Sequence, residues 1–268
     1  MLGTIEQDRL AGLLGTTTRM PPSTPTQATF TNLDTGSRLS KVSHAVDPDL
    51  TVDLAATHIY ATAQRTLDAW AAGEARIDWG VSGTVNGKAW SLRRHDAWGS
   101  GWDIVDEMTW MLFEKLHMLT EVGSAKVALD RVWVTGTLTE ETVRSRVSGV
   151  EVRKRGGGWA DLRADPVVKK GAPLRLRVTV ASSDGSRDVV TRTMGKARAG
   201  KTRVAVRGGG GRDVWVEGPF AVRLAALRSA PSGDHAYLSA TRKGQQRQAA
   251  VAFDHVVTGK VTGAVRAR

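Results

Sequence analysis

Residues 75–90 read Ala-Arg-Ile-Asp-Trp-Gly-Val-Ser-Gly-Thr-Val-Asn-Gly-Lys-Ala-Trp, and they decide the fold of the N-terminal half. Alternate residues from 75 to 85 are mostly apolar, which is the pattern of a half-buried β-strand. Asn86-Gly87 follows at once and favours a two-residue hairpin turn, because both residue types accept the positive φ angles of that turn. The stretch therefore predicts a long hairpin whose second strand leaves through residues 89–92.

Amphipathic helices are expected on both sides of this hairpin. Apolar residues recur at three- and four-residue intervals from about residue 50 until Gly73, and again from Ser100 until about Gly123. Ser100, with Asp103 three residues later, resembles a capping box and favours a helix start at residue 100. Each helix therefore has one apolar face with which to cover the sheet.

Further strands are expected at about 28–33, from the turn at 34–37 to about residue 46, at 125–134 and at 142–152. Together with the hairpin and the helices they predict an α+β domain over residues 26–155, a mostly antiparallel sheet with two helices on one face. Residues 1–25 are rich in Thr and Pro without periodicity, so we expect an extended leader there.

The triple glycine at 156–158 is the expected domain boundary. Beyond it the apolar period is nearly always two, with turns such as Asp184-Gly185 between short strands. This pattern predicts a mostly β, immunoglobulin-like sandwich over residues 159–268, interrupted by one short helix at about 219–229.

Charge separates the two halves. Residues 1–150 hold 14 Lys and Arg against 18 Asp and Glu, whereas residues 151–268 hold 24 against 9, within an overall net charge of +11. A basic second half suits contact with an anionic partner such as wall polymer or nucleic acid, and it equally suits a solvated Arg-rich surface.

Known catalytic patterns are not met. The chain has no cysteine, which excludes thiolate chemistry. Residues 80–84, Gly-Val-Ser-Gly-Thr, look like a serine peptidase motif, but Ser82 falls inside a strand where a nucleophile needs a sharp turn. The six histidines are scattered with no partner pattern. We therefore predict no catalytic residue, no metal site and no cofactor, and the longest apolar runs predict no membrane span.

Tryptophan is abundant, with 9 in the chain. Trp70 and Trp79 fall on apolar stripes and are expected in the core. Trp98 and Trp102 fall in the glycine-containing stretch 97–102, which is predicted as a loop and is a candidate partner-binding edge. Further candidate partner-binding residues are the cations before the triple glycine, Arg153, Lys154 and Arg155.

The opening residues 3–13 read Gly-Thr-Ile-Glu-Gln-Asp-Arg-Leu-Ala-Gly-Leu. They resemble the segment that follows the catalytic domain in SpoIVB-type serine peptidases and their actinobacterial relatives. The strand ending at 32–36, the Lys-Lys-Gly-Ala run at 169–172 and the Pro-Ser-Gly-Asp turn at 231–234 are similar to the C-terminal part of the same proteins. The family's catalytic Ser and His belong to a domain that would precede residue 1, so no catalytic residue is carried over to this chain.

The resemblance implies a non-catalytic, extracytoplasmic region of a parent serine peptidase, although the chain begins without a secretion signal. Such a region would brace the upstream peptidase domain or dock it to an envelope partner, its basic half meeting anionic wall polymer. The alternative is a free-standing carbohydrate- or wall-binding module that uses Trp98 and Trp102. Nucleic-acid binding through the basic half is less favoured, because aromatic residues for base stacking are few there.

Overall fold

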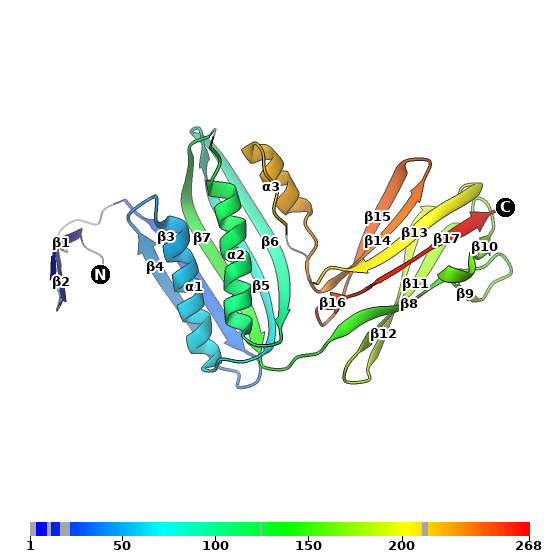
Figure 1. Cartoon of the computed structure of the whole chain (residues 1–268), viewed down its shortest axis with the longest axis horizontal. Helices are drawn as coiled ribbons and strands as arrows, with labels where there is room; N and C mark the ends of the chain where they lie inside the picture. The colour runs from blue at the N-terminus through cyan, green and yellow to red at the C-terminus, as the bar shows by residue number, and fades with distance from the viewer. Residues whose placement is uncertain (1–3, 10–11, 17–21, 124, 211–213) are drawn as a thin grey trace.

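The computed structural model describes residues 4–9, 12–16, 22–123, 125–210 and 214–268. Figure 1 shows a helix-covered sheet, called here the first unit, beside a β-rich second unit that ends at the C-terminus. The described residues therefore form a β-rich architecture with three α-helices, one short 3₁₀ helix (Leu162–Ala164) and several sheets.

The first unit is built on a five-stranded sheet in the order β4-β3-β7-β5-β6. All neighbouring strands in it are antiparallel except β3 and β7, which are parallel. Its elements are β3 (Thr24–Asn32), β4 (Arg38–Ala45), α1 (Thr51–Leu67), β5 (Gly73–Val85), β6 (Lys88–Ser100), α2 (Ile104–Thr120) and β7 (Val127–Thr139).

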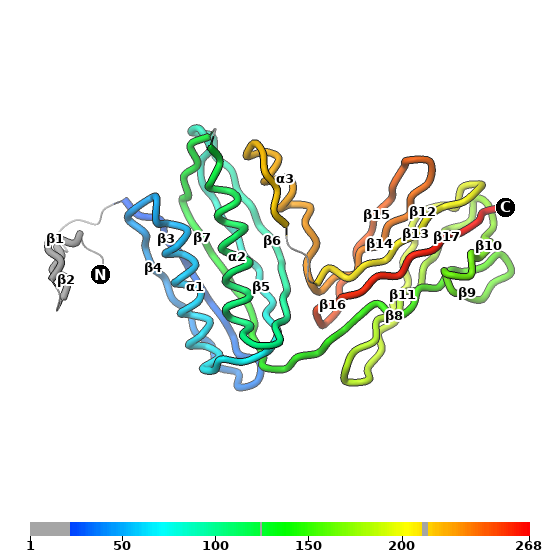
Figure 2. Tube along the Cα trace, viewed as in Figure 1, coloured from blue at the N-terminus to red at the C-terminus, as the bar shows by residue number. Residues whose placement is uncertain are grey.

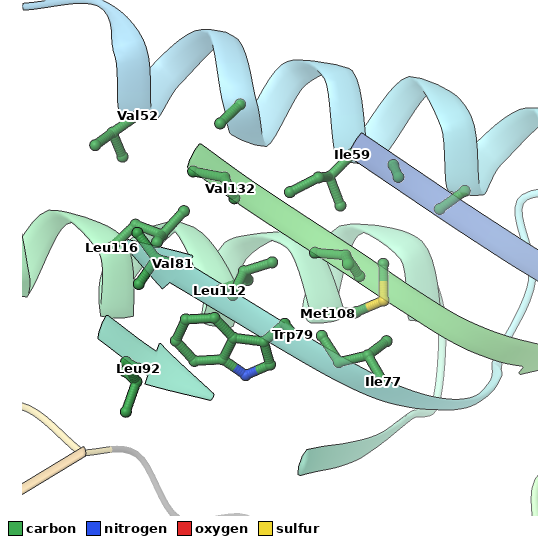
Figure 3. Close-up of a cluster of buried hydrophobic side chains, with 14 of the residues drawn as sticks. Val52, Ile59, Ile77, Trp79, Val81, Leu92, Met108, Leu112, Leu116 and Val132 are labelled. Carbon is green, nitrogen blue, oxygen red and sulfur yellow. The ribbon is translucent and has the colours of Figure 1, made fainter. Parts of the chain in front are cut away.

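The predicted hairpin forms around Asn86 and Gly87, whose φ angles are 48° and 79°. Both values lie in the left-handed region that a two-residue turn of this kind requires. The turn sets a regular register in which Asp78 lies opposite His95 and Gly73 opposite Ser100. The alternation then directs Ile77, Trp79 and Val81 toward α1 and α2, as predicted from the sequence (Figure 3).

Both helices bury one apolar stripe on this sheet. In Figure 3, Val52 and Ile59 of α1 and Met108, Leu112 and Leu116 of α2 lie in one buried cluster with the indole of Trp79. Trp79, Ile59 and Met108 are fully buried. Burial of large side chains against one another supplies the main favourable free energy of this unit.

The second unit contains two further sheets that enclose a shared apolar core. One has the order β10-β17-β13-β14-β15, and the other the order β12-β11-β8-β16 with β9 paired to β8. Its strands are β8 (Ser145–Arg153), β9 (Trp159–Asp161), β10 (Val167–Val168), β11 (Pro173–Ser182), β12 (Arg187–Lys196), β13 (Gly200–Gly208), β14 (His235–Arg242), β15 (Gln245–Ala252), β16 (Val257–Thr258) and β17 (Lys260–Ala267). The arrangement fits a β-rich sandwich, and the immunoglobulin-like topology stays a prediction.

Helix α3 (Phe220–Ser229) leaves the second unit between β13 and β14 and packs on the first. Figure 2 shows it beside β6, separated from the strands that precede and follow it. Its inward residues Phe220, Leu224 and Leu227 belong to the core cluster of α1, α2 and the first sheet, and Phe220 meets Trp90 edge-on at 4.9 Å between ring centroids. The chain therefore passes from the second unit to the first before α3 and returns after it, two crossings that the sequence pattern does not predict.

The structure differs from the expected organisation at two places. Strand β8, expected to close the first unit, pairs with β11 in the second, and the triple glycine at 156–158 lies between β8 and β9. The reason is that a strand's own pattern does not say which sheet it joins. The expected leader contains a separate two-stranded sheet, β1 (Thr4–Arg9) with β2 (Gly12–Thr16); residues 1–3, 10–11 and 17–21 of the leader lie outside the described residues.

Helix ends also differ from expectation. Asp68 adopts a left-handed φ of 58° and ends α1 before Trp70, which is 74% exposed instead of buried. Ser100 is still in β6, and Asp103 is itself the N-cap of α2, accepting from the backbone N–H groups of Val105 and Asp106. The aspartate replaces the predicted capping box because its own carboxylate satisfies two free N–H groups.

Leu227→Ala tests whether α3 is part of the first unit's core. The side chain is fully buried, so its truncation is expected to lower the free energy of unfolding by about 2–5 kcal/mol. Val222→Ala, at a position of the same helix that is 48% exposed, is the matched control and is expected to cost about 0.5 kcal/mol or less. Equal small losses in urea unfolding of both variants would contradict the packing.

Candidate functional site at the junction of the two units

Three successive residues of β6, Arg94, His95 and Asp96, form the centre of the junction. Because side chains alternate along a strand, Arg94 and Asp96 point toward the helices and His95 points to the other face. Both faces of one strand are thereby used to hold the segment from Leu227 to Asp234 of the second unit.

Asp96 is a buried carboxylate surrounded by donors. Its Oδ2 accepts from Trp79 Nε1 at 2.8 Å and from Lys115 Nζ at 3.2 Å, and its Oδ1 accepts from Arg94 Nη2 at 2.5 Å. Burial alone would raise the pKa of Asp96, but the hydrogen bond from Arg94 and the charge of Lys115 outweigh it and lower that pKa. Removing one partner of such a buried cluster typically costs about 3–5 kcal/mol.

Arg94 connects this cluster to α3. Its Nη1 donates to the carbonyl of Leu227 and, at 3.2 Å, to that of Ala230, at the C-terminal end of the helix. At the other end of α3, Arg223 Nη1 donates to the carbonyls of Met118 and Glu121 at the end of α2, each at 2.8 Å. Backbone carbonyls at the C-terminal ends of α2 and α3 therefore accept hydrogen bonds from the guanidinium groups of Arg223 and Arg94, respectively.

Asp234, immediately before β14, is the second buried carboxylate of the junction. It accepts from Ser232 Oγ at 2.6 Å, from His235 Nδ1 at 2.5 Å and from His95 Nε2 at 2.7 Å. Burial would raise the pKa of Asp234, but the hydrogen bonds from His235, His95 and Ser232 outweigh it and hold the pKa well below its usual range. A charged carboxylate is thus kept between the two units.

His95 has a carboxylate at each ring nitrogen, Asp234 at Nε2 and Asp78 at Nδ1, the latter at 3.2 Å. Ionised carboxylates only accept hydrogen bonds, so both nitrogens donate and the ring is an imidazolium. The hydrogen bond that His95 donates to Asp234 raises the pKa of His95 to about 8, against the opposing effect of burial. His95 therefore carries a positive charge across the neutral range.

The turn that presents Asp234 approaches β6 closely. A Cβ on Gly233 would lie 2.0 Å from the carbonyl oxygen of Ala97, so this position requires a glycine. Tyr237 supports the same turn, since its hydroxyl accepts from the backbone N–H of Ser232 at 2.6 Å. The junction is therefore fixed by backbone fit as well as by charge.

Ser232, Asp234, His95 and His235 are the residue types of a hydrolytic triad, but their connections differ from one. In a triad the hydroxyl is bonded to an imidazole, which the acid orients. Here Ser232 Oγ donates to Asp234 itself, and both imidazoles bond to the same carboxylate. The buried Ser232 hydroxyl is thus bonded to the carboxylate and to neither imidazole of this cluster, an arrangement that suits holding two surfaces together.

A second contact between the units lies at a cleft of about 310 Å³, lined by Glu74, Ser100, Arg144 and Val256 among others. Glu74 is buried there, and His255 Nδ1 lies 3.4 Å from its Oε2. Burial raises the pKa of Glu74 in spite of the neighbouring His255 and Arg76. The contact between Glu74 and His255 thus joins one residue of each unit beside this cleft.

The residues proposed from the sequence are found in different places. Trp98 lies on β6 and not in the predicted loop. Its ring packs against the first unit's core, with Lys115 Nζ 4.4 Å from the ring centroid. Trp102 is 64% exposed. Arg153 ends β8, and Lys154 and Arg155 begin the turn that follows, all three exposed. The structure therefore does not bring the two tryptophans into one exposed surface.

Sequence reasoning missed the histidine cluster, since His95 and His235 share Asp234 and are not scattered. Part of the signal was present: the Asn86-Gly87 turn fixes the register that places His95 opposite Asp78. Ser82, by contrast, lies within β5 as expected, opposite Ser91.

Two features are absent from the described residues. No group of three or more His, Asp or Glu in that part of the chain is arranged to hold a metal ion. Within the same residues, no helix has both the length and the apolar character needed to span a membrane.

The chain matches no family model, no curated protein and no solved structure. The junction must therefore be interpreted from its own chemistry.

His95 predicts a pH-dependent stability. Because its pKa in the folded protein lies above the ordinary value of 6.5, its contribution is complete below pH 6.5 and is lost as the pH rises through about 8. That shift corresponds to roughly 2 kcal/mol. The 38% exposure of the side chain reduces the expected effect to on the order of 1 kcal/mol.

The measurement is the difference in unfolding free energy between the wild type and His95→Gln at pH 6 and at pH 8.5. The difference should be larger at pH 6, and the contribution of Glu74, which is present in both proteins, cancels from it. A difference that stays constant between the two pH values would show that the imidazolium does not hold the junction.

Proposed function

We propose that this chain is the non-catalytic C-terminal region of a SpoIVB-like serine peptidase protein and that it acts by contact. Its role is to brace the upstream peptidase domain or to dock that domain to an extracytoplasmic envelope partner. The sequence support is the resemblance of residues 3–13 and of the turn at 231–234; of the first segment, residues 3, 10 and 11 lie outside the described residues.

The junction is the observation that carries the proposal. A brace must hold two surfaces in a fixed relation. Here buried Asp234 accepts a hydrogen bond from His95 across the interface, and buried Asp96 is bonded to Arg94 beside it. The inward residues of α3 are buried in the other unit's core. A hinge between independent domains is usually formed by an exposed linker with few contacts. The turn 231–234, part of the proposed family resemblance, is itself at the centre of the junction.

The charge distribution supports an anionic partner. The second half holds most of the chain's excess of Lys and Arg, while the first half is slightly acidic. Wall polymers that carry phosphate or carboxylate groups are attracted by such a surface without a requirement for a shaped pocket. We assign the docking function to the second unit on this ground.

The alternative is a free-standing carbohydrate- or wall-binding module. The observation that favours it is the exposed indole of Trp102, which offers a flat apolar surface of the kind that stacks on sugars. Trp98 does not contribute to it, because its ring packs against the core and Lys115.

Co-sedimentation with isolated actinobacterial cell walls separates the two functions. The wild type is expected to sediment with the walls at low salt and to be released as salt rises, because the contact is electrostatic. Trp102→Ala is expected to sediment equally. Loss of sedimentation in Trp102→Ala alone would favour the carbohydrate-binding alternative, and absence of sedimentation in the wild type would contradict envelope docking.

The same preparation should leave casein intact. Casein cleavage that disappears in Ser232→Ala or Ser82→Ala would contradict the non-catalytic part of the proposal.

A further inference from the structure

A basic groove of about 720 Å³ lies at the end of the second unit where the β12–β13 connection meets β15. In Figure 2 the β12–β13 connection (yellow) and the β14–β15 hairpin (orange) are on the same side of this unit. Four cations line the groove, and an adjoining hollow adds a fifth: Lys170, Lys196, Arg198, Arg247 and Arg242.

The guanidinium groups of this groove are held in place by neutral acceptors. Arg247 Nη1 donates to the carbonyls of Met194 and Lys196 at 3.2 and 3.1 Å, and Arg198 Nη1 donates to Gln245 Oε1 at 2.8 Å. Gly195, with a φ of 83°, permits this placement, since a Cβ there would lie 2.4 Å from Arg247 Nη1. These bonds orient the cations while leaving their charge uncompensated.

No Asp or Glu side chain balances the five cations within the described part of the chain. None of them forms an ion pair there, and neither hollow is lined by Asp or Glu. Elsewhere in the same unit cations do find acids: Arg177 pairs with Glu151 at 2.7 Å, and Lys201 and Arg266 lie near Asp165. Like charges gathered without a counter-ion repel one another, so an anion in the groove would be favoured.

We propose that this groove binds a linear phosphodiester polymer of the polyol-phosphate kind. Phosphate oxygens accept paired hydrogen bonds from guanidinium groups, and several cations in one open groove match a repeating charge better than a single ion. Neither hollow is lined by an aromatic residue, so the groove has no surface on which nucleic-acid bases could stack. The inference rests on the proposed function, because it names the site and the chemistry of the docking partner.

The test compares two charge reversals of equal size. Lys196→Glu with Arg198→Glu alters the groove. Lys154→Glu with Arg155→Glu alters the exposed turn after β8, the rival binding surface predicted from the sequence, and changes the net charge by the same amount. Binding to purified poly(glycerol phosphate) is measured by titration calorimetry at about 50 and about 200 mM salt. The groove variant is expected to bind about tenfold or more weakly than the wild type, and the turn variant within about threefold. Unchanged circular dichroism and melting temperature exclude misfolding as the cause.

Each other outcome overturns the inference in a distinguishable way. Equal losses in both variants, or a larger loss in the turn variant, would remove the groove and leave envelope docking standing. Tighter wild-type binding to an oligothymidylate or to duplex DNA at the same phosphate concentration would assign the groove to nucleic acid. No wild-type binding to poly(glycerol phosphate), together with retention on whole cell walls, would exclude this ligand class alone. Failure of both assays would overturn the docking function as well.

Discussion

The alternation of side chains along β6 at Arg94 and His95 is the constraint on which the rest of the structure depends. Arg94 points toward the helices and bonds to the end of α3, whereas His95 points to the opposite face of the sheet and bonds to Asp234. Both faces of β6 therefore contact the chain of the second unit. Charged groups are costly to bury, and they are tolerated here because each is paired and hydrogen-bonded. Replacing one of them would leave its partner unpaired in the interior, which makes the junction sensitive to individual residues.

The cations of the junction are paired with carboxylates, whereas those of the groove are not, which suggests that the two groups have different roles. In the junction, Arg94 and His95 are neutralised by Asp96 and Asp234, and their binding energy is used within the molecule. In the groove at the far end, Arg198 and Arg247 have acceptors but no acid, so their charge remains available to a partner.

Much of the first unit could be predicted from local sequence, because its pattern is locally determined. The Asn86-Gly87 turn, the alternation through Trp79 and the stripes of α1 and α2 each follow from periods and turn chemistry. Partner choice over long distances could not be predicted in this way. The placement of β8 in the second unit, the burial of Leu227 in the first and the meeting of His95 with Asp234, which are 139 residues apart, depend on how finished elements pack. Trp70 shows the same limit on a smaller scale, since one left-handed residue, Asp68, ended the helix early and exposed it.

The most direct test of a fixed junction is a distance distribution between the two units. The chain contains no cysteine, so Lys41→Cys on β4 and Arg192→Cys on β12, both exposed positions, give two unique sites for nitroxide labels. Pulsed dipolar spectroscopy at pH 6 is expected to give one narrow distribution, because Arg94 and His95 hold the second unit in a single orientation. A broad distribution, or several separated maxima, would show that the units move independently and would contradict a bracing role.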